Sequence, residues 1–185
     1  MSKAVLISIR PEWCELIANG KKTVEVRKSR PKLQTPSKVY IYCTAGTGKN
    51  TLNVPVSYEK ILRHYVETGS MKCLNCHIGN CKVIGEFVCN RIIDIMISCS
   101  DQNMRGIPFH GTGLTDREIM DYIGNGKYGF GWHISDLVIY DKPKELSEFT
   151  GLRNTKFGLE PVSLVRPPQS WCYVEELEKW RDEDG

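Results

Sequence analysis

The chain has 185 residues, a formal net charge of +3 and a hydrophobic content of 41%, which suits one domain with its own core. No apolar run is long enough for a signal peptide or a membrane span, so we expect a cytoplasmic protein without a membrane partner. A net charge this small neither requires nor excludes binding to nucleic acid. In a reducing compartment, the eight cysteines are expected to be free thiols or metal ligands.

The N-terminal segment predicts a strand and then a short helix. Residues 4–9 form a β-branched, apolar run that is typical of a buried strand. Pro11 suits the first turn of a helix, and Gly20 suits a left-handed cap at its end. Between them lies an apolar stripe at helical spacing, formed by Trp13, Leu16 and Ile17.

The next stretch, residues 20–28, combines a strand pattern with concentrated charge. Val24 and Val26 share one face of the predicted strand, and Glu25 and Arg27 share the other. Lys21 and Lys22 lie at the turn before the strand and are close enough to join the charged face. The pattern alone favours a solvated outer face with an ion pair, and the alternative is a binding site.

The middle of the chain predicts two strands separated by an insertion. Residues 38–43 alternate cleanly, and residues 82–96 resume strand character. Gly85 is expected to mark a bulge that bends the second of these strands. Residues 44–81 are polar and poor in apolar residues, so they are interpreted as a loop inserted into one domain that covers residues 1–185.

The C-terminal half predicts one more helix and one clear strand. A capping box at Thr115–Glu118 opens the helix, which Gly124 closes. A strand is predicted over residues 130–140, with Pro143 ending it. The rest is interpreted as a C-terminal extension after about residue 147: irregular over 144–162, a short strand over 161–165 and a terminal helix over 174–180.

These elements favour an α+β fold. Strands and helices do not alternate regularly, which argues against a doubly wound parallel sheet. About five or six strands with one helix between the first two predict a small, mainly antiparallel β-barrel with short flanking helices.

Several of these segments together resemble the ASCH (activating signal cointegrator homology) domain family. The similar pieces are Gly-Lys-Lys-Thr-x-Glu-x-Arg, Val-Tyr-Ile-Tyr, Val-Ile-Gly-Glu-Phe and Gly-Trp-His-Ile, within residues 3–43, 82–96 and 128–146. The resemblance implies a PUA-like barrel. It also implies a cleft lined by Lys22, Glu25 and Arg27 that binds RNA or a modified nucleotide.

An RNA site needs cations for phosphate and flat rings for bases. Arg10, Lys21, Lys22 and Arg27 supply cations within one short segment. Trp13, Trp132 and Trp171 are the candidate rings, although packing in the core or at its rim is the favoured role of each. Trp171 is the best candidate for an exposed ring because it follows two prolines. Glu25 would repel phosphate, so it is interpreted as an acceptor for a base edge or as the group that orients Arg27.

Two alternatives use the same chain differently. Some relatives of the fold are amidohydrolases that act on an acetylated cytidine nucleoside with a lysine and a threonine nucleophile. Lys22 matches the lysine, but Glu25 stands at the threonine position. A nucleoside amidohydrolase or an RNA-processing enzyme would therefore need Lys22 and Glu25 in an acid–base role. The other alternative is an adaptor that uses the inserted loop for protein contacts. The oligomeric state is not predicted.

The inserted loop carries a cysteine cluster. Cys73, Cys76 and Cys81, with His77 or a distant cysteine as the fourth ligand, have spacings compatible with a structural zinc. A second CxxC or CxxH pair, which would strengthen the zinc prediction, is absent from the sequence. Free thiols are the alternative, and we expect the fold to require no cofactor.

Overall fold

A computed structural model describes residues 2–45, 80–96, 110–124 and 127–177. In this part of the chain, every strand belongs to one mixed sheet. The strands are β1 (Lys3–Ile9), β2 (Val24–Arg27), β3 (Ser37–Cys43), β4 (Lys82–Met96), β5 (Tyr128–Lys144), β6 (Thr150–Thr155), β7 (Gly158–Ser163) and β8 (Trp171–Glu175). The other elements are the helices α1 (Pro11–Ala18) and α3 (Asp116–Ile123) and the short 3-10 helix η1 (Leu146–Glu148).

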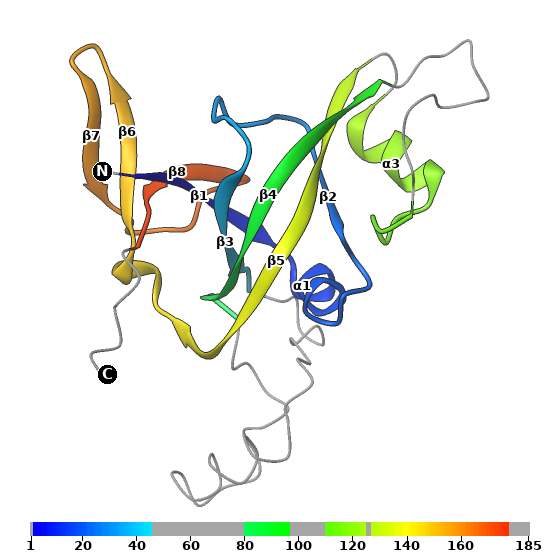
Figure 1. The fold of residues 1–185 in the computed structure, drawn as a ribbon, viewed down its shortest axis with the longest axis horizontal. Coiled ribbons are helices and arrows are strands. Elements are labelled where there is room, and N and C mark those ends of the chain that lie inside the picture. The colour runs from blue at the N-terminus through cyan, green and yellow to red at the C-terminus, as the bar shows by residue number, and fades with distance from the viewer. Residues whose placement is uncertain (1, 46–79, 97–109, 125–126, 178–185) are drawn as a thin grey trace, which may run out of the picture.

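The sheet is mainly antiparallel, as expected, and its strands follow the order β2-β5-β4-β3-β1-β8-β6-β7. Only β1 and β3 run parallel among the described pairs. The order leaves β2 and β7 at the two ends, and no described pairing joins them. The α+β class is therefore established, whereas closure into a barrel stays a prediction. Figure 1 shows the β6–β7 hairpin at one end of the molecule and α3 at the other.

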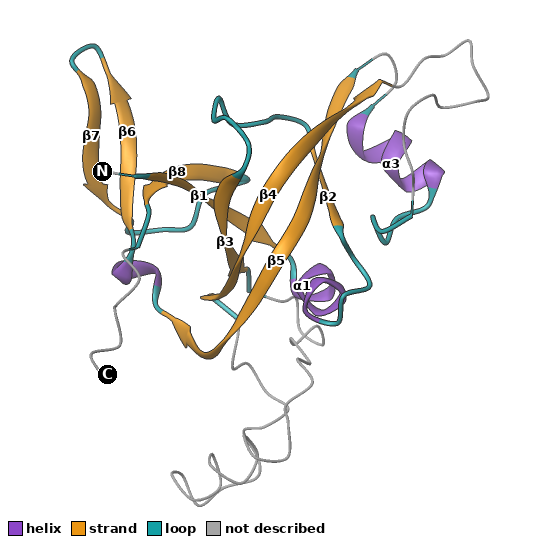
Figure 2. Ribbon diagram, in the orientation of Figure 1, coloured by secondary structure: helices purple, strands orange, loops and turns teal. Residues whose placement is uncertain are grey.

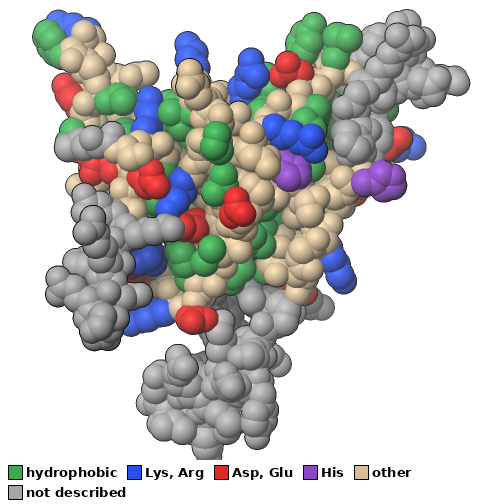
Figure 3. All heavy atoms as spheres, in the orientation of Figure 1, with side chains coloured by type: hydrophobic (Ala, Val, Ile, Leu, Met, Phe, Trp, Pro, Cys, Tyr) green, Lys and Arg blue, Asp and Glu red, His purple; other side chains and the backbone are tan. Residues whose placement is uncertain are grey.

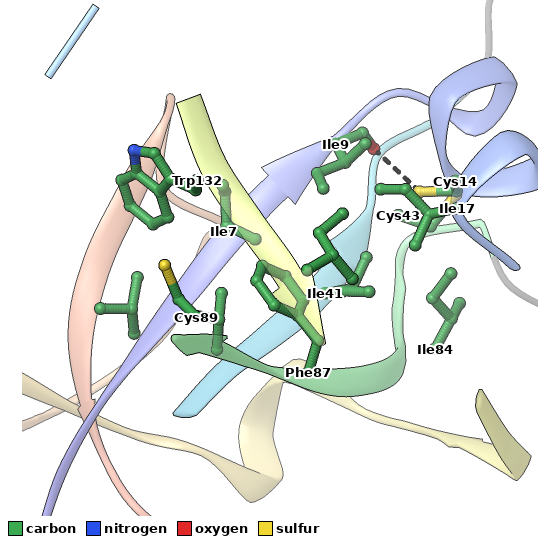
Figure 4. Close-up of a cluster of buried hydrophobic side chains, with 13 residues drawn as sticks. Ile7, Ile9, Cys14, Ile17, Ile41, Cys43, Ile84, Phe87, Cys89 and Trp132 are labelled. Atoms are coloured by element: carbon green, nitrogen blue, oxygen red, sulfur yellow. Dashed lines mark hydrogen bonds between the residues drawn. The ribbon is translucent and has the colours of Figure 1, made fainter. Parts of the chain in front are cut away.

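Strands β1 and β3 are covered on both faces, which explains their nearly continuous apolar sequences. On one face, Val5, Ile7 and Ile9 join the largest core cluster, with Phe87 and Trp132. On the other face, Ala4 and Leu6 pack in a second cluster with Tyr40 and Phe149. Figure 4 shows the first cluster, in which Ile7, Ile41 and Phe87 lie between Trp132 and the residues of α1.

Strands β4 and β5 are long and bent, and Figure 2 shows them crossing the middle of the sheet. Their pairing shifts register between Val83 and Gly85, which confirms the predicted irregularity at this glycine. A Cβ atom on Gly85 would lie 2.3 Å from the carbonyl oxygen of Val138. A residue without a side chain is therefore required where the two backbones approach.

The two helices begin and end where the sequence predicts. Pro11 occupies the first turn of α1, and Gly20 has a positive φ of 68° beyond its last turn. Thr115 and Glu118 form both halves of the capping box of α3. The buried face of α3 carries Ile119 and Ile123, which pack with Val26 and Ile95. None of the described helices is long and apolar enough to span a membrane.

The C-terminal predictions are largely wrong. Strand β5 continues through Pro143 to Lys144, because proline keeps an extended backbone and only removes one donor. Most of the segment expected to be irregular forms the β6–β7 hairpin, and the predicted strand over 161–165 is the end of β7. Trp171–Glu175 is strand β8, paired with β1, so the helix predicted over 174–180 is wrong at its start, and residues 178–180 lie outside the described residues. The aromatic and β-branched residues of Trp171–Val174 are a strand signal that the helical interpretation overlooked.

Candidate functional site

The charged face of β2 is buried, so the solvated outer face favoured by the pattern is wrong. All four residues of β2 are buried, because the strand lies between β5 and other parts of the chain. Val24 and Val26 face the core near α3, as predicted. On the opposite face, Glu25 is 6% exposed and Arg27 is 8% exposed, and Lys22 before the strand is 2% exposed.

Lys22, Glu25 and Arg27 converge, and we call them the motif cluster. The Lys22 ammonium lies 3.3 Å from Glu25 Oε2, and Arg27 Nη2 lies 2.9 Å from Glu25 Oε1. One carboxylate therefore serves two cations, and the formal charge of the cluster is two positive minus one negative, or +1. Such an arrangement is costly to bury unless hydrogen bonds satisfy the remaining donors.

Backbone carbonyls from distant segments complete the motif cluster. Lys22 Nζ donates to the carbonyl oxygen of Thr112, and Arg27 Nη2 donates at 2.7 Å to that of Ser8. The Lys22 ammonium also lies 5.3 Å from the centre of the Trp13 ring, in a cation–π contact. Sequence reasoning missed Thr112 and Ser8, because a carbonyl acceptor has no side-chain signal.

The segment that carries Thr112 is fixed to the start of β2. The carbonyl oxygen of Gly111 accepts hydrogen bonds from the backbone N–H groups of Thr23 at 2.7 Å and Val24 at 2.9 Å. Gly111 has a φ of +91°, and a Cβ there would lie 2.1 Å from Thr23 Oγ1. The glycines on both sides of Thr112 were the available sequence signal for this close approach.

Two rows of side chains run across the sheet on the same face as the motif cluster. In one row, Glu25 lies opposite Trp132, and Trp132 lies opposite Ile92. In the other row, Phe130 lies opposite both Arg27 and Asp94. Residues that are directly opposite in adjacent strands share one face and lie close together. The rows therefore connect the motif cluster with strand β4.

Two donors in these rows have no hydrogen-bond partner among the described residues. They are Arg27 Nε and the indole Nε1 of Trp132, and both atoms are buried. Figure 4 shows the Trp132 nitrogen at the edge of the core cluster, directed away from Ile7 and Phe87. Buried donors are normally satisfied, so these two atoms are exceptions within the described part of the chain.

Two of the candidate stacking rings lie in the interior to different degrees. Trp132 is fully buried, which agrees with the core packing favoured for a tryptophan and leaves its ring unexposed for stacking. Trp171 is half-buried rather than exposed, because its ring packs edge-on against Trp132 at 6.0 Å and Tyr173 at 5.3 Å between centroids. The turn before Trp171 is held by Ser8, whose side chain donates at 2.7 Å to the carbonyl oxygen of Pro168.

The remaining predicted cations lie outside the motif cluster. Arg10 is exposed at the N-terminus of α1, and Lys21 is exposed at the turn before β2. Figure 3 shows lysine and arginine side chains spread over the face in view, among acidic and hydrophobic ones. On this face, recognition of an anion would therefore depend on particular local groups rather than on a broad positive field.

The proposed zinc ligands fall mostly outside the described residues. This applies to Cys73, Cys76 and His77, whereas Cys81 is described and is an exposed free thiol. Within the described ranges, no group of three or more histidine, cysteine or acidic side chains is arranged to hold a metal ion. Structural zinc stays a prediction.

Comparison with known proteins agrees with this architecture. The family model of the ASCH domain matches residues 7–90. This part of the chain is similar to ASCH domains. The match contains the end of β1, all of α1, β2 and β3, and most of β4, and therefore all of the motif cluster. The resemblance inferred from the motifs is confirmed.

Solved ASCH structures share the fold over nearly the whole chain. The crystal structure of ASCH from Zymomonas mobilis aligns with 18% identity and a TM-score of 0.51, covering 94% of this chain and 88% of that one. Structures of two mutants of that protein align with 17% identity and TM-scores of 0.51, covering 95% and 94% of this chain and 92% and 89% of theirs. A search of curated proteins finds no match.

Proposed function

We propose that this protein binds RNA or a modified nucleotide through the motif cluster. The observation that carries the proposal is the buried excess of donors: two cations share one carboxylate, while Arg27 Nε lacks a partner among the described residues. An acceptor-rich group of a ligand would satisfy this excess. Nucleobases carry keto oxygens and ring nitrogens along their edges, and these are acceptors of that kind.

Within the proposal, Glu25 orients Arg27. Its contact at 2.9 Å holds one end of the guanidinium group, and the carbonyl oxygen of Ser8 holds the same nitrogen from another side. Because the guanidinium group is planar, holding Nη2 in place also fixes the direction in which the Nε–H bond of Arg27 points. Trp132 Nε1 lies on the same face and supplies a second donor, which makes recognition of a base edge a better fit than capture of phosphate by the cluster itself.

The test uses Arg27→Lys, which keeps the positive charge beside Glu25 but removes the Nε donor and the planar fork. Binding of a fluorescent, mixed-sequence single-stranded RNA should weaken about tenfold, as loss of a charge-assisted hydrogen bond predicts. The control, Lys156→Ala, removes an exposed cation on the β6–β7 hairpin and should leave affinity unchanged. Thermal unfolding of both variants would establish that each is folded.

Equal affinity for wild type and Arg27→Lys across a salt series would contradict recognition by the motif cluster. Glu25→Gln separates binding from chemistry, because an amide accepts a hydrogen bond but cannot take a proton at neutral pH. Incubation of both proteins with acylated nucleosides and short RNAs, followed by chromatography, would detect turnover. A product formed only by the wild type would favour the enzymatic alternative, and the adaptor alternative predicts no RNA binding by either protein.

A further inference from the structure

We propose that a cavity beside the motif cluster, between residues 30–35 and β4, binds a phosphate group of the RNA or nucleotide. This inference rests on the proposed function and extends it to a second subsite. The cavity has a volume of about 680 Å³ and is lined by residues 30–35 and Ile92. We call it the loop cavity.

The lining of the loop cavity has the chemistry of an anion site. Arg30 and Lys32 contribute two cations, Gln34 and Thr35 contribute polar donors, and none of the seven lining residues is acidic. Both cations are exposed. Arg30 Nη1 lies 3.6 Å from Asp94 Oδ1, and the two side chains are 53% and 66% exposed. An ion pair that is this exposed to solvent is weak. A phosphate group offers Arg30 a stronger, bidentate partner.

The cross-strand rows place the loop cavity next to the motif cluster. Ile92, in the cavity wall, is opposite Trp132, which in turn is opposite Glu25. The Arg30 guanidinium lies 5.3 Å from the centre of the Phe130 ring, and Phe130 is opposite Arg27. One ligand can therefore reach both sites, with its base edge toward Arg27 and its phosphate toward Arg30.

The loop is held in position by the C-terminal strand. Trp171 Nε1 donates at 3.0 Å to Ser29 Oγ, and the backbone N–H of Lys32 donates at 2.7 Å to the Tyr173 hydroxyl. Leu33 packs against the core cluster beneath the loop. These contacts order the backbone that carries both cations before any ligand arrives, which lowers the entropic cost of binding. They also give Trp171 and Tyr173 a role in positioning the loop.

The experiment compares two charge-matched double variants of the full chain. Arg30→Ala with Lys32→Ala removes the cations of the loop cavity. Arg153→Ala with Lys156→Ala removes an arginine in an exposed ion pair, at 3.8 Å from Glu160, and a lysine stacked on Phe157 in the β6–β7 hairpin. The probes are inorganic phosphate, followed by ¹⁵N NMR shifts of backbone amides, and the fluorescent single-stranded RNA over a salt series.

We expect phosphate to shift the amides of residues 30–35 in the wild type and in the hairpin variant, but not in the loop variant. RNA affinity should fall about tenfold or more in the loop variant, and the slope of its logarithm against the logarithm of salt concentration should decrease by about one, as loss of one phosphate contact predicts. Phosphate shifts spread equally over loop and hairpin, or equal loss of RNA affinity in both variants, would overturn the loop cavity as a phosphate site.

The same measurements separate this inference from the proposed function. If Arg27→Lys weakens RNA binding while the loop variant behaves like the hairpin variant, the loop cavity is not a phosphate site and the motif cluster retains its role. If the wild type binds no RNA but phosphate still shifts the amide signals of residues 30–35 specifically, the RNA proposal is wrong and the anion site is supported. If neither RNA binding nor specific phosphate shifts occur, both proposals are wrong.

Discussion

Two ion clusters in this protein are built from similar residues but differ in how they are satisfied. The motif cluster has two cations for one carboxylate and is more than nine-tenths buried. The second, which we call the β3–β4 cluster, has one cation for two carboxylates: Lys38 lies 3.2 Å from Glu86 and 3.3 Å from Glu176. Side-chain exposure in the second cluster ranges from 14% for Lys38 to 30% for Glu176.

Hydrogen bonding separates the two clusters further. In the β3–β4 cluster, the Tyr140 hydroxyl donates at 2.6 Å to Glu86 Oε2. Burial lowers the pKa of Lys38, but the hydrogen bonds to Glu86 and Glu176 and the charge of Glu86 act together against burial, so this pKa is raised. Next to it, the backbone N–H of Leu177 donates at 2.9 Å to the Tyr40 hydroxyl. The β3–β4 cluster thus fastens the segment after β8 to the sheet, whereas Arg27 Nε in the motif cluster has no partner among the described residues.

The difference indicates that a buried ion cluster with paired members is structural, and that one with surplus donors is suited to a ligand. A satisfied cluster gains nothing from a further acceptor, while an unsatisfied donor in the interior is costly until an acceptor reaches it. Three substitutions test whether this contrast extends to stability.

The largest effect is expected from Glu25→Ala. Removing the only carboxylate in the motif cluster leaves Lys22 and Arg27 as buried cations without a counter-ion, which should lower the free energy of unfolding by about 3–5 kcal/mol. Urea denaturation would measure the change. The matched variant is Glu86→Ala, after which Lys38 keeps Glu176, so its cost should be smaller. Equal costs for the two variants would remove the distinction between the clusters.

Lys38→Met should have an intermediate effect. It removes one cation from two partly exposed carboxylates, which water can still solvate, so the expected loss is about 1–2 kcal/mol by the same measurement. Lys82→Met serves as the control, because its pair with Glu145 at 2.6 Å has side chains 38% and 58% exposed. That control should cost less than about 1 kcal/mol. A larger loss in Lys82→Met than in Lys38→Met would show that burial does not set the value of these pairs.

Tyr140→Phe should have the smallest effect at neutral pH, about 1 kcal/mol for the lost hydrogen bond to Glu86. Burial, and then the bond to Glu86, raise the pKa of Tyr140 above its usual value of 10.0. The unfolded chain therefore releases this proton first, and the stabilisation that Tyr140 provides is lost as pH rises above about 10. Thermal melts from pH 8 to 11 should show a shallower alkaline decline for Tyr140→Phe, and parallel curves would contradict this linkage.

The sequence predicted the parts of the fold that depend on local pattern. Pro11 marks the start of α1 and Gly20 marks its end. The Thr115 capping box starts α3, and Gly85 marks the register shift in β4. Each of these signals is read from a few neighbouring residues, because caps and backbone approaches depend on local geometry and side-chain size. The C-terminal strands were missed because β8 gains its stability from pairing with β1, nearly the whole chain away.

For the candidate site, the sequence by itself determined which charges share a face: strand alternation separates Glu25 and Arg27 from Val24 and Val26. Only the tertiary structure decided that this face is buried. Its acceptors are carbonyl oxygens of Ser8 and Thr112, which fold onto β2 from before and after it in the chain. Apart from the glycines that flank Thr112, residue type gives no sign of these acceptors. Alternation fixes a side chain's direction, but burial and solvation depend on which distant segments pack over it.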